Sequence, residues 1–397
     1  MRYDFDRIID RCDTNSSKWD NCGTLFGRDD VLPMWVADMD LPCPEPVVRA
    51  IKERAAHPIY GYTFPSAELY QAIVDWNQRH YGWAIKREWI VFTAGVVNGL
   101  YSAIKAFTHP GDEIVVQPPV YYPFSAAIKN TGCQVLHNQL RLSGGRYEID
   151  FDGLRALFRG RTSFPPRSPK IKMLILCSPH NPVGRVWTAD ELRTLASICR
   201  ENGVILVSDE IHCDLLLYGS KHTNTSTLSP EIESNTITLN SVSKTFNLAG
   251  MHTSYVVIPN PVLRRKYVEQ RAGNCAGNLF GYTAIEAAYR EGDDYLAQLN
   301  TYLQGNMDMF IDGVRTRLPG VEAIEPEGTY LAWLDMRGLG LNAQELEHLI
   351  RQKARLAFDD GWAFGPGGEG FQRVNLACPR SYVAEALDRL EGALKSL

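Results

Sequence analysis

Short runs of apolar residues recur along the chain, and each is bounded by residues that favour turns. Five of these runs are continuous rather than alternating and are rich in β-branched residues: EIVVQPP, KMLILCSP, GVILVSDE, TITLNS and SYVVIP. Strands of a parallel sheet have this pattern because both of their faces are covered and neither meets water. The runs therefore predict an α/β protein with a mostly parallel central sheet.

Helical patterns lie between these runs. In TADELRTLASICREN the apolar positions fall on one stripe, formed by Leu192, Leu195, Ala196 and Cys199. Thr188 is placed to cap the start of this helix, and Glu191 completes a capping box. A further helix is predicted from about Ser66 to Tyr81. Alternation of strands and helices at this spacing indicates βαβ units.

The C-terminal third has a different character. A long polar helical stretch around Asp293 to Leu318 precedes short strands in TYLAWLDM and RVNLAC, and a last helix is predicted from Tyr382. A chain of 397 residues suits two domains better than one core. We expect an N-terminal segment at 1–50 that belongs to the small domain, a large domain at 51–290, and a smaller α+β domain at 291–397.

The segment RGRTSFPPRSP, Arg159 to Pro169, is basic and rich in proline. Its simplest interpretation is a solvated loop, because proline and glycine interrupt both helices and strands. A binding site carried by this loop is the alternative.

Composition and charge narrow the class of protein. Hydrophobic residues make up 45% of the chain and charged residues 22%, as in soluble globular proteins. The formal net charge of −5 gives no electrostatic footprint for nucleic acid or for an anionic membrane. The start MRYDFDRIIDRCD has no apolar signal core, and no long apolar run follows. These features predict a cytoplasmic protein.

The nine cysteines are scattered, odd in number and form no Cys-x-x-Cys pair. Such usage indicates reduced thiols rather than disulfides or zinc ligands. Most of them are expected to be small core residues, and no metal site is predicted.

A lysine and an aspartate follow two of the predicted strands. Lys244, in SVSKTFNLAG, comes after TITLN, and Asp209, in SDEIH, ends the run GVILV. Open α/β sheets place ligands at the carboxyl ends of their strands. A lysine amine can form a Schiff base with an aldehyde, and a carboxylate can hold a pyridinium nitrogen protonated. The pair therefore fits pyridoxal 5′-phosphate, although a cap or an ion pair is the commoner role for a single Asp209.

Two other stretches suit a phosphate. TAGVVNGLYSAIKAF places Gly95 before a predicted helix, whose free backbone N–H groups, at Val96 and Val97, can bind an anion. Ser241 and Ser243 flank Lys244 at a spacing that would bring two hydroxyls to the same phosphate. A plain strand-turn-helix joint is the alternative for the first stretch.

Three residues suit the cofactor ring and the substrate. Tyr121, in PPVYYPF, offers an aromatic face that could stack on a pyridine ring. Asn181, in SPHNPVG, could donate to a phenolic oxygen. Arg373, in FQRVNLACPR, carries a guanidinium fork that matches a carboxylate. A core tyrosine, ordinary turn chemistry and a surface salt bridge are the respective alternatives.

Taken in order, PPVYYPF, SPHNPVG, SDEIH, SVSKTF and RVNLACPR resemble the motifs of fold-type I pyridoxal-phosphate enzymes, the class I/II aminotransferase superfamily. The resemblance spans nearly the whole chain. It implies a three-layer αβα large domain with a smaller α+β domain, pyridoxal 5′-phosphate as cofactor, and Lys244 as the lysine that bears it.

Within that superfamily, three features resemble the cystathionine β-lyase and cysteine-S-conjugate β-lyase branch of the MalY/PatB type. LPMWVADMD matches its N-terminal signature, which implies a substrate contact at Val36 and Ala37. His212 stands where many aminotransferases have a tyrosine bonded to the cofactor's phenolic oxygen. His252, eight residues after Lys244, stands where they usually have an arginine on the phosphate.

The resemblance implies cleavage of an S-substituted cysteine to pyruvate, ammonia and a thiol. Cystathionine, cystine, cysteine and bulkier conjugates all stay open as substrates. An aminotransferase of aromatic or other L-amino acids is the alternative, and binding of a transcription factor is a third possibility. YGYT resembles a loop that reaches the neighbouring subunit's phosphate, which implies a homodimer; Tyr62 is assigned to that role, with Tyr60 as the competing choice.

Overall fold

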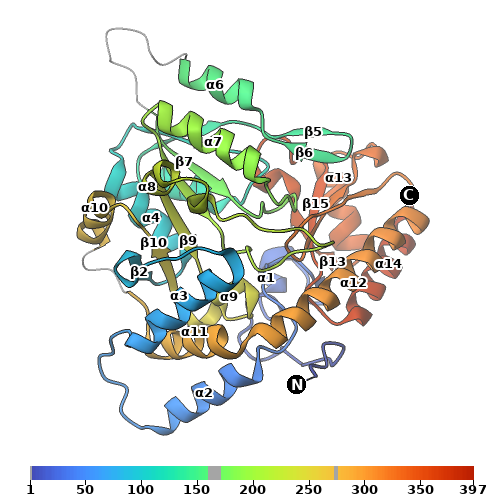
Figure 1. Cartoon of the computed structure of the whole chain (residues 1–397). Helices are drawn as coiled ribbons and strands as arrows, with labels where there is room; N and C mark the ends of the chain where they lie inside the picture. The colour runs from blue at the N-terminus through green and yellow to red at the C-terminus, as the bar shows by residue number, and fades with distance from the viewer. Residues whose placement is uncertain (1, 160–170, 272–275) are drawn as a thin grey trace.

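The computed structural model describes residues 2–159, 171–271 and 276–397 (Figure 1). A seven-stranded sheet forms its centre, in the order β2-β10-β9-β8-β7-β3-β4. The strands are β2 (Ile90–Thr93), β3 (Glu113–Val116), β4 (Gln134–His137), β7 (Ile171–Cys177), β8 (Ile205–Asp209), β9 (Thr236–Asn240) and β10 (Ser254–Val257). Strands β4, β3, β7, β8 and β9 pair in parallel. The mostly parallel central sheet is thus confirmed.

The run SYVVIP departs from the expected direction. Its strand β10 is antiparallel to both neighbours, β9 and β2. All four of its residues are buried. A strand covered on both faces has a continuous apolar sequence whichever way it runs, so the pattern does not encode its direction.

Alternate residues of the central strands face two separate cores. In β7, Met173 and Ile175 belong to the cluster that includes α4 (Val96–Phe107), α5 (Pro123–Asn130) and α10 (Pro261–Arg271). Leu174 and Leu176 belong to the cluster on the other face, with α6 (Phe151–Arg159) and α7 (Ala189–Glu201). This period of two places helices on both faces of the sheet and gives three layers.

Helix termini follow the predicted capping pattern. The Thr188 hydroxyl accepts from the Glu191 N–H at 3.2 Å, and the Glu191 carboxylate accepts from the Thr188 N–H at 2.8 Å, which confirms the capping box of α7. Ser66 caps α3 (Ala67–Tyr81) by accepting from the Leu69 N–H at 3.0 Å. Helices α2 (Glu45–Ala56) and α11 (Leu279–Glu291) pack beside α3 around a common core.

A second, four-stranded sheet lies in the C-terminal part of the chain (Figure 1). Its order is β11-β12-β15-β14, with β11 at Glu322–Ile324, β12 at Leu331–Asp335, β14 at Asp359–Asp360 and β15 at Phe371–Asn375. Helices α12 (Asp293–Arg317) and α14 (Arg380–Leu394) share its core. The predicted strands in TYLAWLDM and RVNLAC are therefore present, and the last helix begins two residues before Tyr382.

The N-terminal segment packs on this second sheet. Strand β1 (Leu32–Pro33) pairs in parallel with β13 (Leu356–Ala357), and Leu32 and Met34 lie in the core with Phe310. The remaining α-helices and strands are α1 (Cys22–Phe26), the hairpin β5 (Arg141–Ser143) and β6 (Arg146–Glu148), α8 (Pro230–Asn235), α9 (Val242–Thr245) and α13 (Ala343–His348).

Three general features concern only the described ranges. None of their helices combines the length and the apolar character needed to cross a bilayer. Their eight cysteines are free thiols. The basic segment predicted as a loop lies outside them, except for Arg159, which ends α6.

Candidate active site

One cavity of about 350 Å³ gathers most of the residues singled out in the sequence. It lies at the carboxyl ends of β7, β8 and β9, against the start of α4 and the strand β15. Twelve of the site residues predicted from the sequence line it: Val36, Ala37, Gly95, Val96, Val97, Tyr121, Asn181, Asp209, His212, Ser243, Lys244 and Arg373. Ser241 and Tyr62 do not line it.

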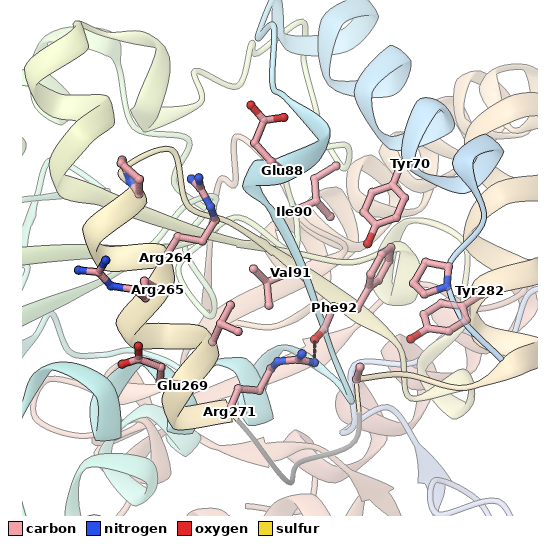
Figure 2. A pocket seen from close by; sticks show the side chains of 14 residues that line it. Tyr70, Glu88, Ile90, Val91, Phe92, Arg264, Arg265, Glu269, Arg271 and Tyr282 are labelled. Atoms are coloured by element: carbon pink, nitrogen blue, oxygen red, sulfur yellow. Dashed lines mark hydrogen bonds between the residues drawn. The ribbon is translucent and has the colours of Figure 1, made fainter. Parts of the chain in front are cut away.

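Size does not single this cavity out. A larger hollow of about 560 Å³ lies between α3, β2 and α10 (Figure 2). Tyr70 and Phe92 line one side of it, and Arg271 donates to the Phe92 carbonyl at 2.8 Å. None of the predicted site residues lines it. Convergence of reactive groups with perturbed pKa values, rather than volume, selects the smaller cavity as the candidate active site.

Lys244 projects from the short helix α9, directly after β9. Its Nζ donates to the Ala37 carbonyl at 2.6 Å. Burial lowers the pKa of Lys244 to about 8, and the Arg373 charge adds to this, whereas Asp38 and Asp209 oppose it. An amine with this pKa is partly neutral near pH 7, and it can therefore act as a nucleophile or as a base.

Asp209 is a buried carboxylate at the end of β8. Its Oδ1 accepts from the Ile211 N–H at 3.1 Å, and no cation pairs with it within the described ranges. Burial raises the pKa of Asp209 to about 7, although the Ile211 N–H and Lys244 act in the opposite direction. A cationic N–H partner would stabilise the ionised form of this buried carboxylate, and a protonated ring nitrogen is such a partner.

The start of α4 provides the anion-binding end of the cavity. Gly95, the N-cap residue, has φ of 105°, and α4 has no side-chain cap. The N–H groups of its first turn, at Val96 and Val97, lack partners within the helix and suit a phosphate. His252 lines the same cavity with φ of 44°.

The two serines beside Lys244 have different surroundings. Ser243 lines the cavity, but Ser241 is wholly buried as the N-cap of α9. The Ser241 hydroxyl accepts from the Ser243 N–H at 3.1 Å, lies 2.7 Å from the Ser243 hydroxyl and donates to the Thr253 carbonyl at 3.2 Å. Ser241 therefore positions Ser243 through contacts with its backbone N–H and its hydroxyl.

Three side chains surround the space beside Lys244. Asn181 accepts from Arg373 Nη1 at 3.1 Å through its Oδ1, which leaves its amide N–H groups available to donate. Burial raises the pKa of the Tyr121 hydroxyl to about 12. Burial and then the Lys244 charge hold the pKa of His212 well below its usual value, so the imidazole is neutral. All three can contact an aromatic ring without adding charge to it.

Arg373 is buried at the other side of the cavity, on β15, with 2% of its surface exposed. Its Nη2 donates to the Trp35 carbonyl at 2.8 Å and pairs with Asp359 on the adjacent strand β14. Its Nε has no hydrogen-bond partner within the described ranges. A buried guanidinium with an unused donor suits a substrate carboxylate.

Sequence reasoning missed several residues of this site. Tyr122 and Cys177 line the cavity, Asp359 pairs with Arg373, and the Tyr330 hydroxyl donates to the Ala37 carbonyl at 2.9 Å. The second tyrosine of PPVYYPF was a visible signal for Tyr122. Asp359 and Tyr330 reach the site through pairing between distant strands, which leaves no local pattern.

Tyr62 lies far out on the segment between α2 and α3, fully exposed to solvent. The Tyr60 hydroxyl donates to the Ala55 carbonyl at 2.7 Å, and its ring packs on Phe280. Tyr60 is thus held by a contact within this chain, whereas the Tyr62 side chain has no hydrogen bond in the described structure.

Nearly the whole chain is similar to known proteins. The family model for aminotransferase class I and II matches residues 29–390. Cystathionine beta-lyase PatB of Bacillus subtilis (strain 168) is 43% identical over 98% of this chain and 99% of its own, and protein MalY of Escherichia coli (strain K12) is 30% identical over the full length of both. Cystalysin from Treponema denticola, solved with pyridoxal 5′-phosphate, superposes with a TM-score of 0.94 at 37% identity over the whole of both chains. The PLP-bound C-S lyase from Staphylococcus hominis superposes with a TM-score of 0.91 at 34% identity, over 99% of this chain and 98% of its own.

Proposed function

This chain belongs to the aminotransferase class I and II family, and from that membership we propose that it is a pyridoxal-phosphate-dependent carbon–sulfur β-lyase. Its substrates are cystathionine or other S-substituted L-cysteines, which it converts to pyruvate, ammonia and a thiol. The convergence of Lys244, Asp209 and Arg373 on one cavity is the observation that carries this proposal. The similarity to PatB, MalY and the C-S lyases selects the lyase branch.

The cavity fits the cofactor. The unpaired, buried Asp209 suits its ring nitrogen, the uncapped start of α4 and Ser243 suit its phosphate, and the free amide of Asn181 suits its phenolic oxygen. When bound, pyridoxal 5′-phosphate supplies an aldehyde for covalent attachment and a ring that takes up the electron pair of a broken Cα–H bond. These residue roles are part of the proposal.

The chain's own groups then perform the remaining work. Arg373 binds the substrate carboxylate and fixes rotation about Cα. Lys244, once free as an amine, accepts the Cα proton as a general base, and a thiolate leaves from Cβ. Hydrolysis by water completes the conversion to pyruvate and ammonia. An aminotransferase would use the same groups but return the proton elsewhere, so this reaction is the alternative activity.

The expected result of an acceptor test separates these two activities. With an S-substituted cysteine and no keto acid, the enzyme should release thiol and pyruvate in equal amounts over many turnovers. Colorimetric thiol assay and lactate dehydrogenase-coupled pyruvate assay measure the two products. Turnover that stops at one equivalent per cofactor and resumes only when a keto acid is added would contradict the lyase assignment.

Replacement of Arg373 tests the carboxylate contact. We expect Arg373→Lys to raise KM and lower kcat together, because an ammonium restores the charge but not the two parallel N–H···O bonds. Loss of a charged hydrogen bond of this kind costs about 1.5–3 kcal/mol. Steady-state kinetics on an S-substituted cysteine and on its carboxamide measure the effect.

Arg337→Lys is the matched control, since Arg337 is half-exposed and pairs with Asp335 away from the cavity. If Arg373→Ala kept the full wild-type preference for the acid over the carboxamide, another residue would hold the carboxylate, and Arg380 would be examined next.

We also propose that the chain works as a homodimer in which Tyr62 reaches the partner's cavity. The segment between α2 and α3 leaves Ile59 at 67%, Tyr62 at 112% and Phe64 at 84% exposed, which is an unusual run of apolar surface for an isolated subunit. A second copy of the chain that covers this segment would bury it, and the free hydroxyl of Tyr62 could then bond the partner's phosphate.

Subunit mixing tests this arrangement. Tyr62→Ala and Lys244→Ala should each have low activity alone. Mixed one to one and refolded together, they should recover about a quarter of wild-type activity, because half of the dimers are mixed and each mixed dimer has one intact site. Activity no greater than the sum of the two separate variants would show that Tyr62 does not act across subunits.

The division into domains is a further proposal: a segment at 1–50 with the small domain, a large cofactor-binding domain at 51–290 and the small domain's main part at 291–397. The pairing of β1 with β13 and the shared core of Leu32 with Phe310 support it.

We propose a cytoplasmic location, which the free thiols support.

A further inference from the structure

A strap, defined as residues Trp35–Asp40 of the N-terminal segment, contacts both reactive cations of the cavity. The Trp35 carbonyl accepts from Arg373 Nη2 at 2.8 Å. The Ala37 carbonyl accepts from Lys244 Nζ at 2.6 Å. Backbone carbonyls of one short segment thus hold the two side chains that would bind and deprotonate the substrate.

The carbonyl between these two, that of Val36, points elsewhere, and so does the Asp38 carbonyl that follows. Those of Val36 and Asp38 accept from Asn375 Nδ2 at 2.7 and 2.6 Å. The strap bends at Val36 and Ala37, where the Asp38 N–H donates to the Val36 carbonyl at 2.9 Å, and its successive carbonyls alternate between cavity groups and Asn375. Any rotation or slip of the strap would move the carbonyls of Trp35 and Ala37 out of reach of Arg373 and Lys244 together.

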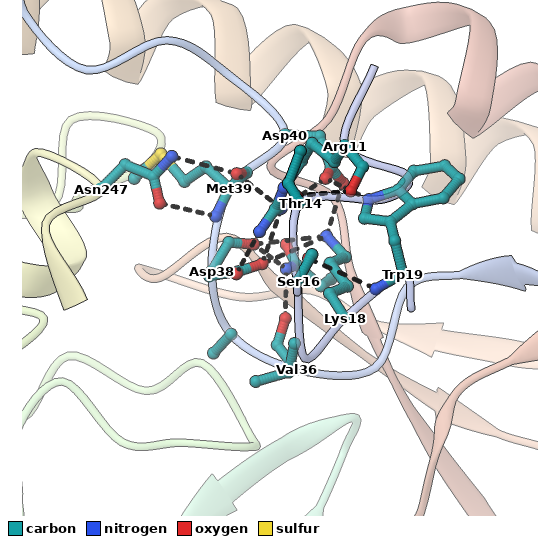
Figure 3. A network of polar contacts seen from close by, with 12 residues as sticks. Arg11, Thr14, Ser16, Lys18, Trp19, Val36, Asp38, Met39, Asp40 and Asn247 are labelled. Atoms are coloured by element: carbon teal, nitrogen blue, oxygen red, sulfur yellow. Dashed lines mark hydrogen bonds and ion pairs between the residues drawn. The ribbon is translucent and has the colours of Figure 1, made fainter. Parts of the chain in front are cut away.

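A charged network holds the strap (Figure 3). Arg11 pairs with Asp38 at 2.7 Å and with Asp40 at 2.7 Å. Lys18 Nζ lies 2.5 Å from Asp40 Oδ2 and donates to the Asp38 carbonyl at 3.3 Å. The Trp19 indole N–H donates to Asp40 at 2.8 Å.

Stability alone is a poor explanation for this network. The side chain of Lys18 is completely buried and that of Asp40 is 3% exposed. Desolvation offsets much of the attraction within a buried ion pair, so that well-packed apolar residues often serve stability as well or better. A buried pair of this kind is better explained by the single geometry it imposes on the backbone that carries it.

We propose that Arg11, Lys18, Asp38 and Asp40 are positioning residues for the reaction. They hold the strap so that the Ala37 carbonyl places the Lys244 amine and the Trp35 carbonyl orients the Arg373 guanidinium. The inference rests on the proposed function of those two residues, and it assigns a task to the two acidic positions of LPMWVADMD, which contact no cavity group directly.

Asp38 also acts on Lys244 through its charge. Lys244 faces Arg373 from β15, Asp209 from β8, the neutral His212, Tyr330 beside Ala37, and Asp38 from the strap. Asp38 and Asp209 are the two groups that oppose the lowering of the Lys244 pKa. Removing the Asp38 charge and loosening the Ala37 carbonyl both disfavour the ammonium form, so the two effects have the same sign.

Asp38→Asn is the decisive variant. The readout is trace acetylation of the apoenzyme by acetic anhydride against pH, quantified at Lys244 by peptide mass spectrometry. We expect the midpoint for Lys244 to fall by about one pH unit, the size of shift expected when a nearby opposite charge is lost. Asp38→Glu should restore most of it. Asp30→Asn, which removes an exposed partner of Arg28 in the same segment, should leave it unchanged.

A second variant tests the buried pair without changing net charge. Lys18→Met combined with Asp40→Asn should raise KM and lower kcat for an S-substituted cysteine at least several-fold, with thermal unfolding still cooperative.

An unchanged Lys244 midpoint in Asp38→Asn overturns the inference, and so do unchanged kcat and KM in the folded double variant. The wild-type apoenzyme is also given pyridoxal 5′-phosphate: failure to attach it at Lys244 overturns the proposed function itself, a separate outcome because no substrate is involved.

Discussion

Replacing Lys244 with alanine is expected to lower kcat for β-elimination by about 10⁴-fold, at the upper end for loss of a general base. In the proposed function the same amine also bears the cofactor, so the variant should bind pyridoxal 5′-phosphate without a covalent bond. The low pKa of about 8 leaves the Lys244 amine partly neutral near pH 7, so that it can act as a base. Asp209 is assigned to the ring nitrogen in the proposed function, and burial holds the pKa of His212 well below its usual value, which makes it a poor base.

Steady-state pyruvate release on the folded variant measures this effect. Lys395→Ala is the matched control, since Lys395 is the exposed C-cap residue of α14 and pairs with Glu391. A small primary amine such as methylamine should restore part of the lost activity of Lys244→Ala by replacing the missing base. Activity within tenfold of wild type would place the base elsewhere.

Asp209→Asn should reduce kcat by about 10² to 10³-fold, the usual cost of losing one electrostatic stabiliser of a developing charge. An amide fills the same space and can still contact a ring nitrogen, but it cannot hold that nitrogen protonated. Cofactor binding should therefore fall much less than turnover. Burial already raises the pKa of Asp209 to about 7, so a cationic partner is needed to keep it ionised.

Cofactor titration by fluorescence and kinetics on the same preparation separate the two effects in this variant. Asp190→Asn serves as the control, because Asp190 is exposed on α7 and pairs with Arg193. Equal losses in cofactor affinity and in turnover would mean that Asp209 only helps to hold the cofactor. An elimination rate close to that of the wild type would show that Asp209 is not part of the active site.

The sheet and the chief reactive groups could be predicted from sequence because both follow local rules. Buried strands have continuous apolar runs, and side chains placed directly after parallel strands meet at one edge of the sheet. Lys244 after β9 and Asp209 at the end of β8 are of this kind. The direction of β10 could not be predicted, since burial on both faces gives the same sequence in either direction.

The supporting contacts could not be predicted because they depend on register and on backbone atoms. Asp359 reaches Arg373 because β14, a strand of two residues with no apolar pattern, pairs with β15. The two serines beside Lys244 look equivalent in sequence, but the N-cap geometry of α9 buries Ser241 and leaves Ser243 at the cavity. The carbonyls of Trp35 and Ala37 leave no mark in the sequence, because every residue has one.

The most direct test of the account is to locate the cofactor's covalent bond. The purified enzyme, saturated with pyridoxal 5′-phosphate, is reduced with borohydride, digested and mapped by mass spectrometry. The account predicts one modified peptide, the one that contains Lys244, and loss of the label when an S-substituted cysteine is present in excess before reduction. A label on another lysine, or no label on a protein that has taken up the cofactor, would contradict it.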